Sequence, residues 1–164
     1  MHETLRSIET FLYHTGYGDF MRTSMWAWPV WESIHFLGMS MLIGTVGLFD
    51  LRLLGFARSV PIGAMHRLIP IGIGGFLMNL STGLGFLMAT PDQYLYNKAF
   101  MVKATLLVIA GCNVLFFYGR VFRRLELQGP HAPPPAGARI AGGISLTAWI
   151  GVMAAGRLLT FYRP

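Results

Sequence analysis

Charged residues are scarce in this sequence. Only 12% of its 164 residues are Asp, Glu, Lys or Arg, whereas 54% are hydrophobic. Soluble domains carry about 25% charged residues, so this composition excludes an ordinary soluble globular domain. The formal net charge is +6, but the basic residues stand singly between apolar runs and form no patch interleaved with aromatics. We therefore expect no nucleic-acid binding and predict a multi-pass membrane protein.

Cysteine is almost absent as well. The single one, Cys112, stands inside an apolar run. It cannot form an intrachain disulfide, and we interpret it as a small packing residue. The N-terminal region also lacks a basic segment followed by an apolar one, so we expect no cleavable signal peptide there. Membrane insertion would then be driven by the first span.

Four long apolar runs dominate the rest of the chain. Each has about 20 residues or more, which is enough to cross the hydrocarbon core of a bilayer. We expect spans at about residues 29–53, 62–89, 96–118 and 140–161, with a Pro-rich loop at 125–138. The fold class that follows is an all-α membrane protein, with a four-transmembrane-helix bundle over residues 26–162.

Residues 1–25 precede this bundle. Apolar residues recur there at helical spacing, with charged residues between them. They are Leu5, Ile8, Phe11 and Leu12. This pattern predicts an amphipathic helix that lies at the membrane interface and ends at Gly16 and Gly18.

The basic residues indicate an orientation. Four spans place both termini on one side of the membrane, with five basic residues there if Lys103 is counted as intramembrane. The opposite side has seven: Arg52, Arg58, Arg67, Arg120, Arg123, Arg124 and Arg139. The positive-inside rule then places both termini outside the cytoplasm.

Ionisable residues interrupt the spans near the membrane face that holds the termini. Measured from aromatic residues at that face with the helical rise, His35 and Arg157 lie about 6 Å deep and Lys103 about 10 Å deep. We expect one polar layer built from Glu32, His35, Asn79, Thr82, Lys103 and Arg157. Ionisable residues inside a span mark a functional site by default.

Two interpretations of this layer stay open. The first is polar glue that fixes the register of the helices. The second is a cofactor site, in which His35 offers an imidazole nitrogen to iron and Glu32 orients that imidazole. Lys103 and Arg157 would pair with carboxylates such as haem propionates. Two glycines of the second span would leave room for a flat macrocycle: Gly83 and Gly85.

Other candidates are weaker. Met39 follows His35 by one helical turn, and thioether with imidazole suits Cu(I). His14 and His66 are further candidate metal ligands, although His66 belongs to the opposite membrane face. There it accompanies charged residues that we interpret as interfacial ion pairs reaching water. These are Asp50, Arg52, Arg67 and Arg120.

Several segments resemble two related groups of small bacterial membrane proteins. They are IHFLGMSMLIGTVGLFDLRLL, MHRLIPIGIGGF with TGLGFL, and NKAFMVKATLLVIAGCN, within about residues 30–118. One group is the membrane-integral protoporphyrinogen IX oxidase family of haem biosynthesis. The other is the copper-resistance D-like family, whose uncharacterised members this chain resembles most. The shared positions are His35, Met65, Arg67, Leu68, Pro70, Gly83 and Lys103.

The resemblance to the oxidase family implies a b-type haem, with His35 and Lys103 as functional residues. It also implies the bacterial inner membrane as location. That family tends to carry a His further along its third span, where this chain has Asn113. The resemblance therefore implies the fold and a haem more strongly than a particular reaction.

Three functions remain as hypotheses. The leading one is a membrane protein that binds haem b for electron transfer or tetrapyrrole chemistry, as an oxidoreductase or its membrane subunit. The second is a copper-handling membrane protein, and the third is a cofactor-free accessory subunit of a larger complex. Because the loops are too short for a soluble catalytic domain, we expect a homo-oligomer or a subunit of a larger membrane complex in each case.

Overall fold

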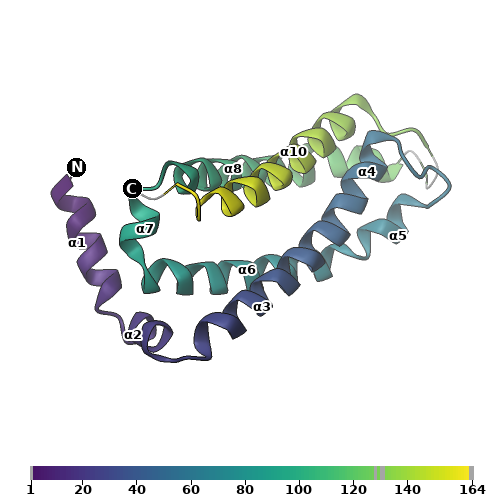
Figure 1. Ribbon diagram of the computed structural model, residues 1–164. Coiled ribbons are helices and arrows are strands. Elements are labelled where there is room, and N and C mark those ends of the chain that lie inside the picture. The colour runs from purple at the N-terminus through teal and green to yellow at the C-terminus, as the bar shows by residue number, and fades with distance from the viewer. Residues whose placement is uncertain (1, 128, 130–131, 163–164) are drawn as a thin grey trace.

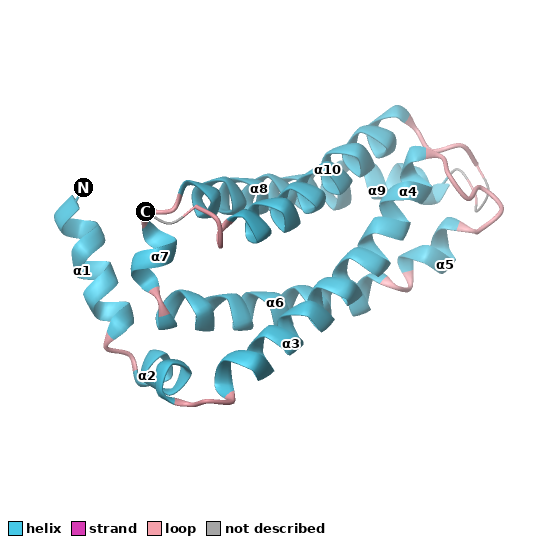
Figure 2. Ribbon diagram, in the orientation of Figure 1, coloured by secondary structure: helices cyan, strands magenta, loops and turns pink. Residues whose placement is uncertain are grey.

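Four long apolar helices form this protein. The computed structural model describes residues 2–127, 129 and 132–162, and it is helical throughout apart from short connections (Figure 2). The helices long and apolar enough to cross a membrane are Ala27–Leu54, Ile62–Ala89, Lys98–Glu126 and Ala136–Leu158. The predicted fold class, an all-α protein with four candidate membrane spans, is therefore confirmed.

The first span has three segments, α3 (Ala27–Leu42), a π-helical turn η1 (Ile43–Gly47) and α4 (Leu48–Leu54). It ends at Gly55, whose φ of 99° is the left-handed conformation that closes many helices. The second span comprises α5 (Ile62–His66) and α6 (Ile69–Ala89). Pro70 occupies the first turn of α6, where its missing N–H costs nothing.

The third span contains α8 (Lys98–Phe116), a second π-helical turn η2 (Phe117–Val121) and α9 (Phe122–Leu127). It begins at Asn97, whose side chain accepts a hydrogen bond from the N–H of Ala99. The fourth span is α10 (Ala136–Leu158). The loop expected at 125–138 is therefore shorter at both ends, and Gln128, Pro130 and His131 lie outside the described residues.

The spans form two hairpins. Helix α3 packs along α6, and α8 packs along α10. Helix α4 packs on α10 and joins the hairpins at one end, whereas the hairpins diverge toward α7 (Pro91–Leu95) at the other (Figure 1). Two clusters of buried apolar residues lie between the hairpins where they meet, one around Phe49 and Phe117 and one around Leu42 and Trp149.

Helices α3 and α6 cross with their backbones nearly in contact. A Cβ added to Gly75 would lie 2.5 Å from the carbonyl oxygen of Gly38, and one added to Gly38 would lie 2.8 Å from the carbonyl oxygen of Gly75. Small residues permit this kind of approach in membranes, where van der Waals packing and not the hydrophobic effect joins helices. The two glycines therefore set the distance between the helices of the first hairpin.

The N-terminal region contains two helices where one was predicted. Helix α1 (His2–Tyr13) ends before the glycines, and α2 (Gly16–Thr23) begins at Gly16. The break occurs because the Thr15 hydroxyl caps α2, accepting a hydrogen bond from the N–H of Gly18 at 3.2 Å. Arg22 then donates to the carbonyls of Met88 and Ala89 at 3.1 and 3.2 Å, which fixes α2 to the end of α6.

We predict that Gly75→Ala destabilises the protein, because the new methyl group would overlap the backbone of α3. Overpacking of this kind costs about 1–3 kcal/mol, and thermal unfolding in detergent would show it as a lower midpoint. The matched control is Gly74→Ala, since a Cβ at Gly74 meets nothing within 4 Å. Equal midpoints for the two variants would contradict the close crossing of α3 and α6.

We predict that the contact between α1 and the start of the third span depends on the ionisation of Tyr96. The Tyr96 hydroxyl donates to Glu9 Oε2 at 2.9 Å. This hydrogen bond raises the pKa of Tyr96 above its usual range. The contact therefore stabilises the fold fully below the pKa of a free tyrosine, about 10, and its contribution is lost as the pH rises through the folded pKa.

Glu9→Gln should return the Tyr96 pKa toward its ordinary value. The measurement is an ultraviolet titration of phenolate, with Tyr96→Phe to identify the signal and Glu3→Gln as control. An unchanged titration in Glu9→Gln would show that α1 does not dock here.

Candidate functional site

His35 and Thr82 join the two helices of the first hairpin. His35 lies half-buried on α3, and its Nδ1 is 2.7 Å from Oγ1 of buried Thr82 on α6. The Thr82 hydroxyl also donates to the carbonyl of Met78 at 2.7 Å. A hydroxyl has one hydrogen to donate, so its oxygen accepts the N–H of His35 Nδ1. This tautomer leaves the lone pair of His35 Nε2 available to a metal ion.

One aromatic ring contacts this imidazole, and a second ring packs behind the first. The ring of Phe86 on α6 stands edge-on to His35 at 5.7 Å between centroids. Trp28 of α3 packs in turn on Phe86 at 4.9 Å. Sequence reasoning missed both aromatic partners, although Phe86 follows Thr82 by four residues, the spacing that places two side chains on one helix face. The imidazole is therefore oriented by one hydroxyl and borders an apolar ring.

Lys103 of α8 brings a positive charge to the same layer from the second hairpin. Its side chain is half-buried, and Nζ lies 3.7 Å from the position that a Cβ on Gly156 of α10 would take. It is near enough to His35 for the two to interact electrostatically. Within the described ranges, its ammonium group forms no ion pair or hydrogen bond, so it is available to an anionic group.

Asn79 lies one turn before Thr82 on α6. Its Cγ lies 3.3 Å from the position of a Cβ on Gly38, which places the amide in the crossing of α3 and α6. Its buried Oδ1 has no hydrogen-bond partner among the residues that the structure describes. Of the predicted layer, His35 and Thr82 are in contact, Asn79 lies one turn from Thr82, and Lys103 interacts with His35 electrostatically.

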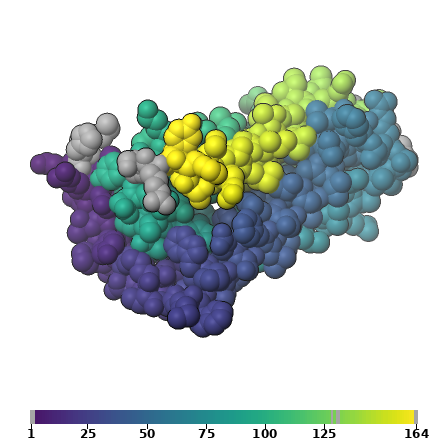
Figure 3. Space-filling view, in the orientation of Figure 1, coloured from purple at the N-terminus to yellow at the C-terminus, as the bar shows by residue number. Residues whose placement is uncertain are grey.

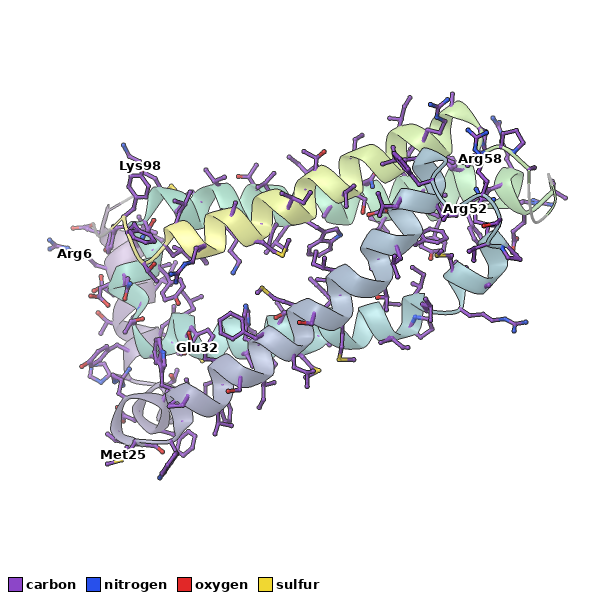
Figure 4. The ribbon with its side chains drawn as sticks, turned by 45° about the vertical axis from the view of Figure 1, so that its right-hand side comes forward. Arg6, Met25, Glu32, Arg52, Arg58 and Lys98 are labelled. Atoms are coloured by element: carbon purple, nitrogen blue, oxygen red, sulfur yellow. The ribbon has the colours of Figure 1, made fainter. Side chains whose placement is uncertain are left out.

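Glu32 and Arg157 do not join this group. Glu32 lies exposed on α3, toward the end of the molecule that also holds Arg6 and Lys98 (Figure 4). Its charge acts on Tyr94, whose pKa is raised by burial and, to a lesser degree, by Glu32. Arg157 is exposed too, with its guanidinium 5.7 Å above the ring of Phe161. Neither residue forms an ion pair with Lys103 or His35 in the described part of the chain.

The two glycines expected to make room for a macrocycle differ in the space beside them. A Cβ on Gly83 would meet nothing within 4 Å, so open space adjoins α6 there. A Cβ on Gly85 would lie 3.0 Å from the Trp31 indole and 3.0 Å from the Tyr17 ring. Gly85 therefore accommodates Trp31, whose Nε1 donates to the Tyr17 hydroxyl, and the expectation for Gly85 is wrong.

The remaining candidate ligands lie apart from one another. His14 is exposed at the end of α1, beside Tyr13. His66 lies near the opposite end of the molecule, where its Nε2 is 3.1 Å from the Tyr118 hydroxyl and its ring stacks on Phe122. Met39 is half-buried one turn beyond His35. Across residues 2–127, 129 and 132–162, no three His, Cys, Asp or Glu side chains gather to hold a metal ion.

The expectation that Asp50 and Arg52 reach water at the interface is wrong. Instead of reaching water, they are 3% and 0% exposed. Arg52 Nε donates to the carbonyl of Val60 at 2.9 Å, so the guanidinium folds back into the loop after α4. Asp50 lies where α4 touches α10, and the hydroxyl of Ser145 on α10 interacts with its carboxyl group. Asp50 is buried where α10 packs on α4, and Arg52 is buried beside the loop that holds Val60.

Comparison of the chain with family models, with curated proteins and with solved structures found no match. The geometry of the site therefore carries the functional argument.

We predict that Thr82→Val releases the imidazole of His35, because valine preserves the shape and removes the acceptor of the Nδ1–H. A hydrogen bond of this kind contributes about 1 kcal/mol, so the unfolding midpoint should fall. Nitrogen NMR of labelled histidine should show a single tautomer for His35 in the wild type and a mixture in the variant. Thr82→Ser keeps the hydroxyl and should preserve the wild-type signal; a mixture in the wild type would contradict the assignment.

Proposed function

We propose that this chain is a multi-pass membrane protein that binds haem b between its two hairpins, with His35 as an axial ligand. The observation that supports this most directly is the hydrogen bond from His35 Nδ1 to Thr82. Histidines that ligate metals almost always donate their other ring N–H to a protein acceptor, which fixes the tautomer and the ring orientation. His35 has this arrangement on a membrane-length helix.

The surroundings of His35 fit a haem in three further ways. The space beside Gly83 is open, and the rings of Phe86 and Trp28 offer an apolar wall. Lys103 supplies a cation without a counter-ion among the described residues. A propionate would neutralise it through a charge-assisted hydrogen bond. Arg157, exposed near the same face, could pair with a second propionate only by turning away from Phe161.

Haem in such a site supplies one-electron chemistry, and the chain's residues would set its properties. Thr82 holds the imidazole in one orientation. From α8, Lys103 would compensate the negative charge of a propionate. The rings of Phe86 and Trp28 would shield the layer from water. The axial ligand, the hydrogen bonds behind it and the burial of the site are the terms by which proteins tune a haem. Electron transfer or chemistry on a tetrapyrrole is the class of activity that we infer.

His35 and Lys103 are also the two positions that the family resemblance implies. The structure contributes an independent reason to pair them, since residues from different hairpins lie within electrostatic reach of each other. The copper hypothesis has less support, because Met39 is the nearest soft ligand and adds one thioether to one imidazole. An accessory role without cofactor is the outcome that a colourless protein would favour.

The exposed arginines support an orientation. Six of them lie near the end where α4, α5 and α9 meet, whereas Arg52 is buried. They are Arg58, Arg67, Arg120, Arg123, Arg124 and Arg139. We infer that this end faces the cytoplasm of a bacterium and that both termini lie on the other side of the inner membrane.

We predict that the protein purified in mild detergent has a Soret band, with sharp α and β bands after reduction. His35→Ala should lose these bands because the axial nitrogen is removed. The control is His66→Ala, which removes a histidine at the opposite end and should retain the spectrum. A colourless wild type that also fails to take up added haemin would overturn the proposal.

Lys103 provides a second test of the same site. Lys103→Gln should weaken haem retention by about tenfold or more, since a charge-assisted hydrogen bond contributes about 1.5–3 kcal/mol. Lys98→Gln, an exposed lysine on the first turn of the same helix, should bind haem like the wild type. Equal retention in both variants would leave His35 as ligand and exclude Lys103 as a propionate partner.

A further inference from the structure

Asp50 is a carboxyl group buried within a candidate membrane span, away from the site around His35. It belongs to α4, four residues before the helix ends at Leu54. At the helical rise this is about 6 Å from the end of the span. The chain has seven acidic residues, and Asp50 alone among them is classed as buried, at 3% exposure.

Helix α10 covers this carboxyl group. Figure 3 shows the start of α10, in lime, lying directly against the blue α4. A Cβ on Gly142 would lie 3.0 Å from the backbone oxygen of Asp50 and 2.9 Å from Cβ of Leu53, so the helices touch at this level. One turn further along α10, the hydroxyl of buried Ser145 interacts with the Asp50 carboxyl group. The second oxygen, Oδ2, is buried and has no partner within the described residues.

No cation compensates Asp50 in the described part of the chain. Arg52, on the same helix, directs its Nε to the carbonyl of Val60. From α5, His66 contacts the Tyr118 hydroxyl of η2. From α10, Arg139 is exposed near the helix start. The described ion pairs do not include Asp50.

Two polar side chains of adjoining helical segments have other hydrogen-bond partners. The amide of Asn113 on α8 donates to the carbonyl of Ala141 at 2.9 Å. Thr45 of η1 donates to the carbonyl of Met41 at 2.7 Å. Burying a carboxylate without a counter-ion is so unfavourable that the group neutralises itself by taking up a proton. The Ser145 hydroxyl can stabilise one carboxylate oxygen, but Oδ2 has no donor among the described residues, so burial favours the neutral acid.

We propose that Asp50 is a proton-binding site inside the bundle, which holds one proton at neutral pH and exchanges it with water at the arginine-rich end. In the loaded state the carboxylic acid O–H donates to Ser145 Oγ. On release, the proton passes to water and the Ser145 hydroxyl turns to donate to the carboxylate. A hydroxyl both donates and accepts, so the same partner serves both states. The site depends on α4 and α10 and not on haem binding.

Infrared spectroscopy of the reconstituted protein tests this directly. A protonated carboxylic acid has a carbonyl stretch that is separate from the amide and carboxylate bands. We expect this band at neutral pH, its shift in heavy water, and its loss in Asp50→Asn. Ser145→Ala should move the band to higher frequency, because the hydrogen bond is lost. Asp19→Asn, which alters an exposed carboxylate paired with Arg22, should leave it unchanged.

Labelling the aspartates with a heavy carbon isotope provides the same test without any substitution, should Asp50→Asn fail to fold. The band must then shift to lower frequency. The proposal is overturned if the band is missing at neutral pH, if it persists in Asp50→Asn, or if it does not respond to heavy water. The last result would describe a buried acid that exchanges no proton.

Discussion

The close crossing of α3 and α6 is the contact on which the candidate site depends. Two glycine backbones approach until a methyl group on either would overlap the other helix. This approach places Thr82 within hydrogen-bonding distance of His35. A larger residue at Gly38 or Gly75 would push the helices apart and weaken this hydrogen bond. The imidazole would then be an unpaired polar group in an apolar medium, which is costly.

Hydropathy and length sufficed to predict the four candidate spans, because a bilayer selects for those two properties. The ends of the helices depend on local chemistry that hydropathy does not report. Asn97 caps α8 through its side chain, so the helix begins at Lys98 and not at Tyr96. Thr15 caps α2 and divides the N-terminal region into two helices. Asn and Thr are common capping residues, but the sequence identifies them as caps only when the start of the helix is already known.

The depth of the polar layer was also predictable, whereas the rotation of each helix was not. Counting residues from an aromatic at the membrane face gives the level of a side chain and leaves its direction undetermined. His35 and Lys103 are half-buried and interact electrostatically, whereas Glu32 and Arg157 are exposed. Rotation is set by packing between spans. Gly85 illustrates this, because the space beside it is filled by Trp31 from another helix.

The π-helical turn η1 adds a rotation that no periodic pattern foresees. It lies between His35 and Asp50, and its wider i→i+5 hydrogen bonding takes up an extra residue. The face of α4 is thereby turned relative to that of α3. Asp50, which follows this turn, lies at the contact with α10 and does not reach water beside the loop. The directions of side chains after the turn therefore differ from those of one regular helix.

His35 and Asp50, toward opposite ends of the first span, have the same kind of polar partner. Each buried or half-buried ionisable group has the hydroxyl of a neighbouring helix as its partner, Thr82 for His35 and Ser145 for Asp50. The two hydroxyls differ in whether they can donate to the ionisable group, because the Thr82 hydroxyl already donates its hydrogen to the carbonyl of Met78. Thr82 therefore fixes one tautomer, as a metal ligand requires, whereas a serine that can reverse its hydrogen bond suits a group that gains and loses a proton.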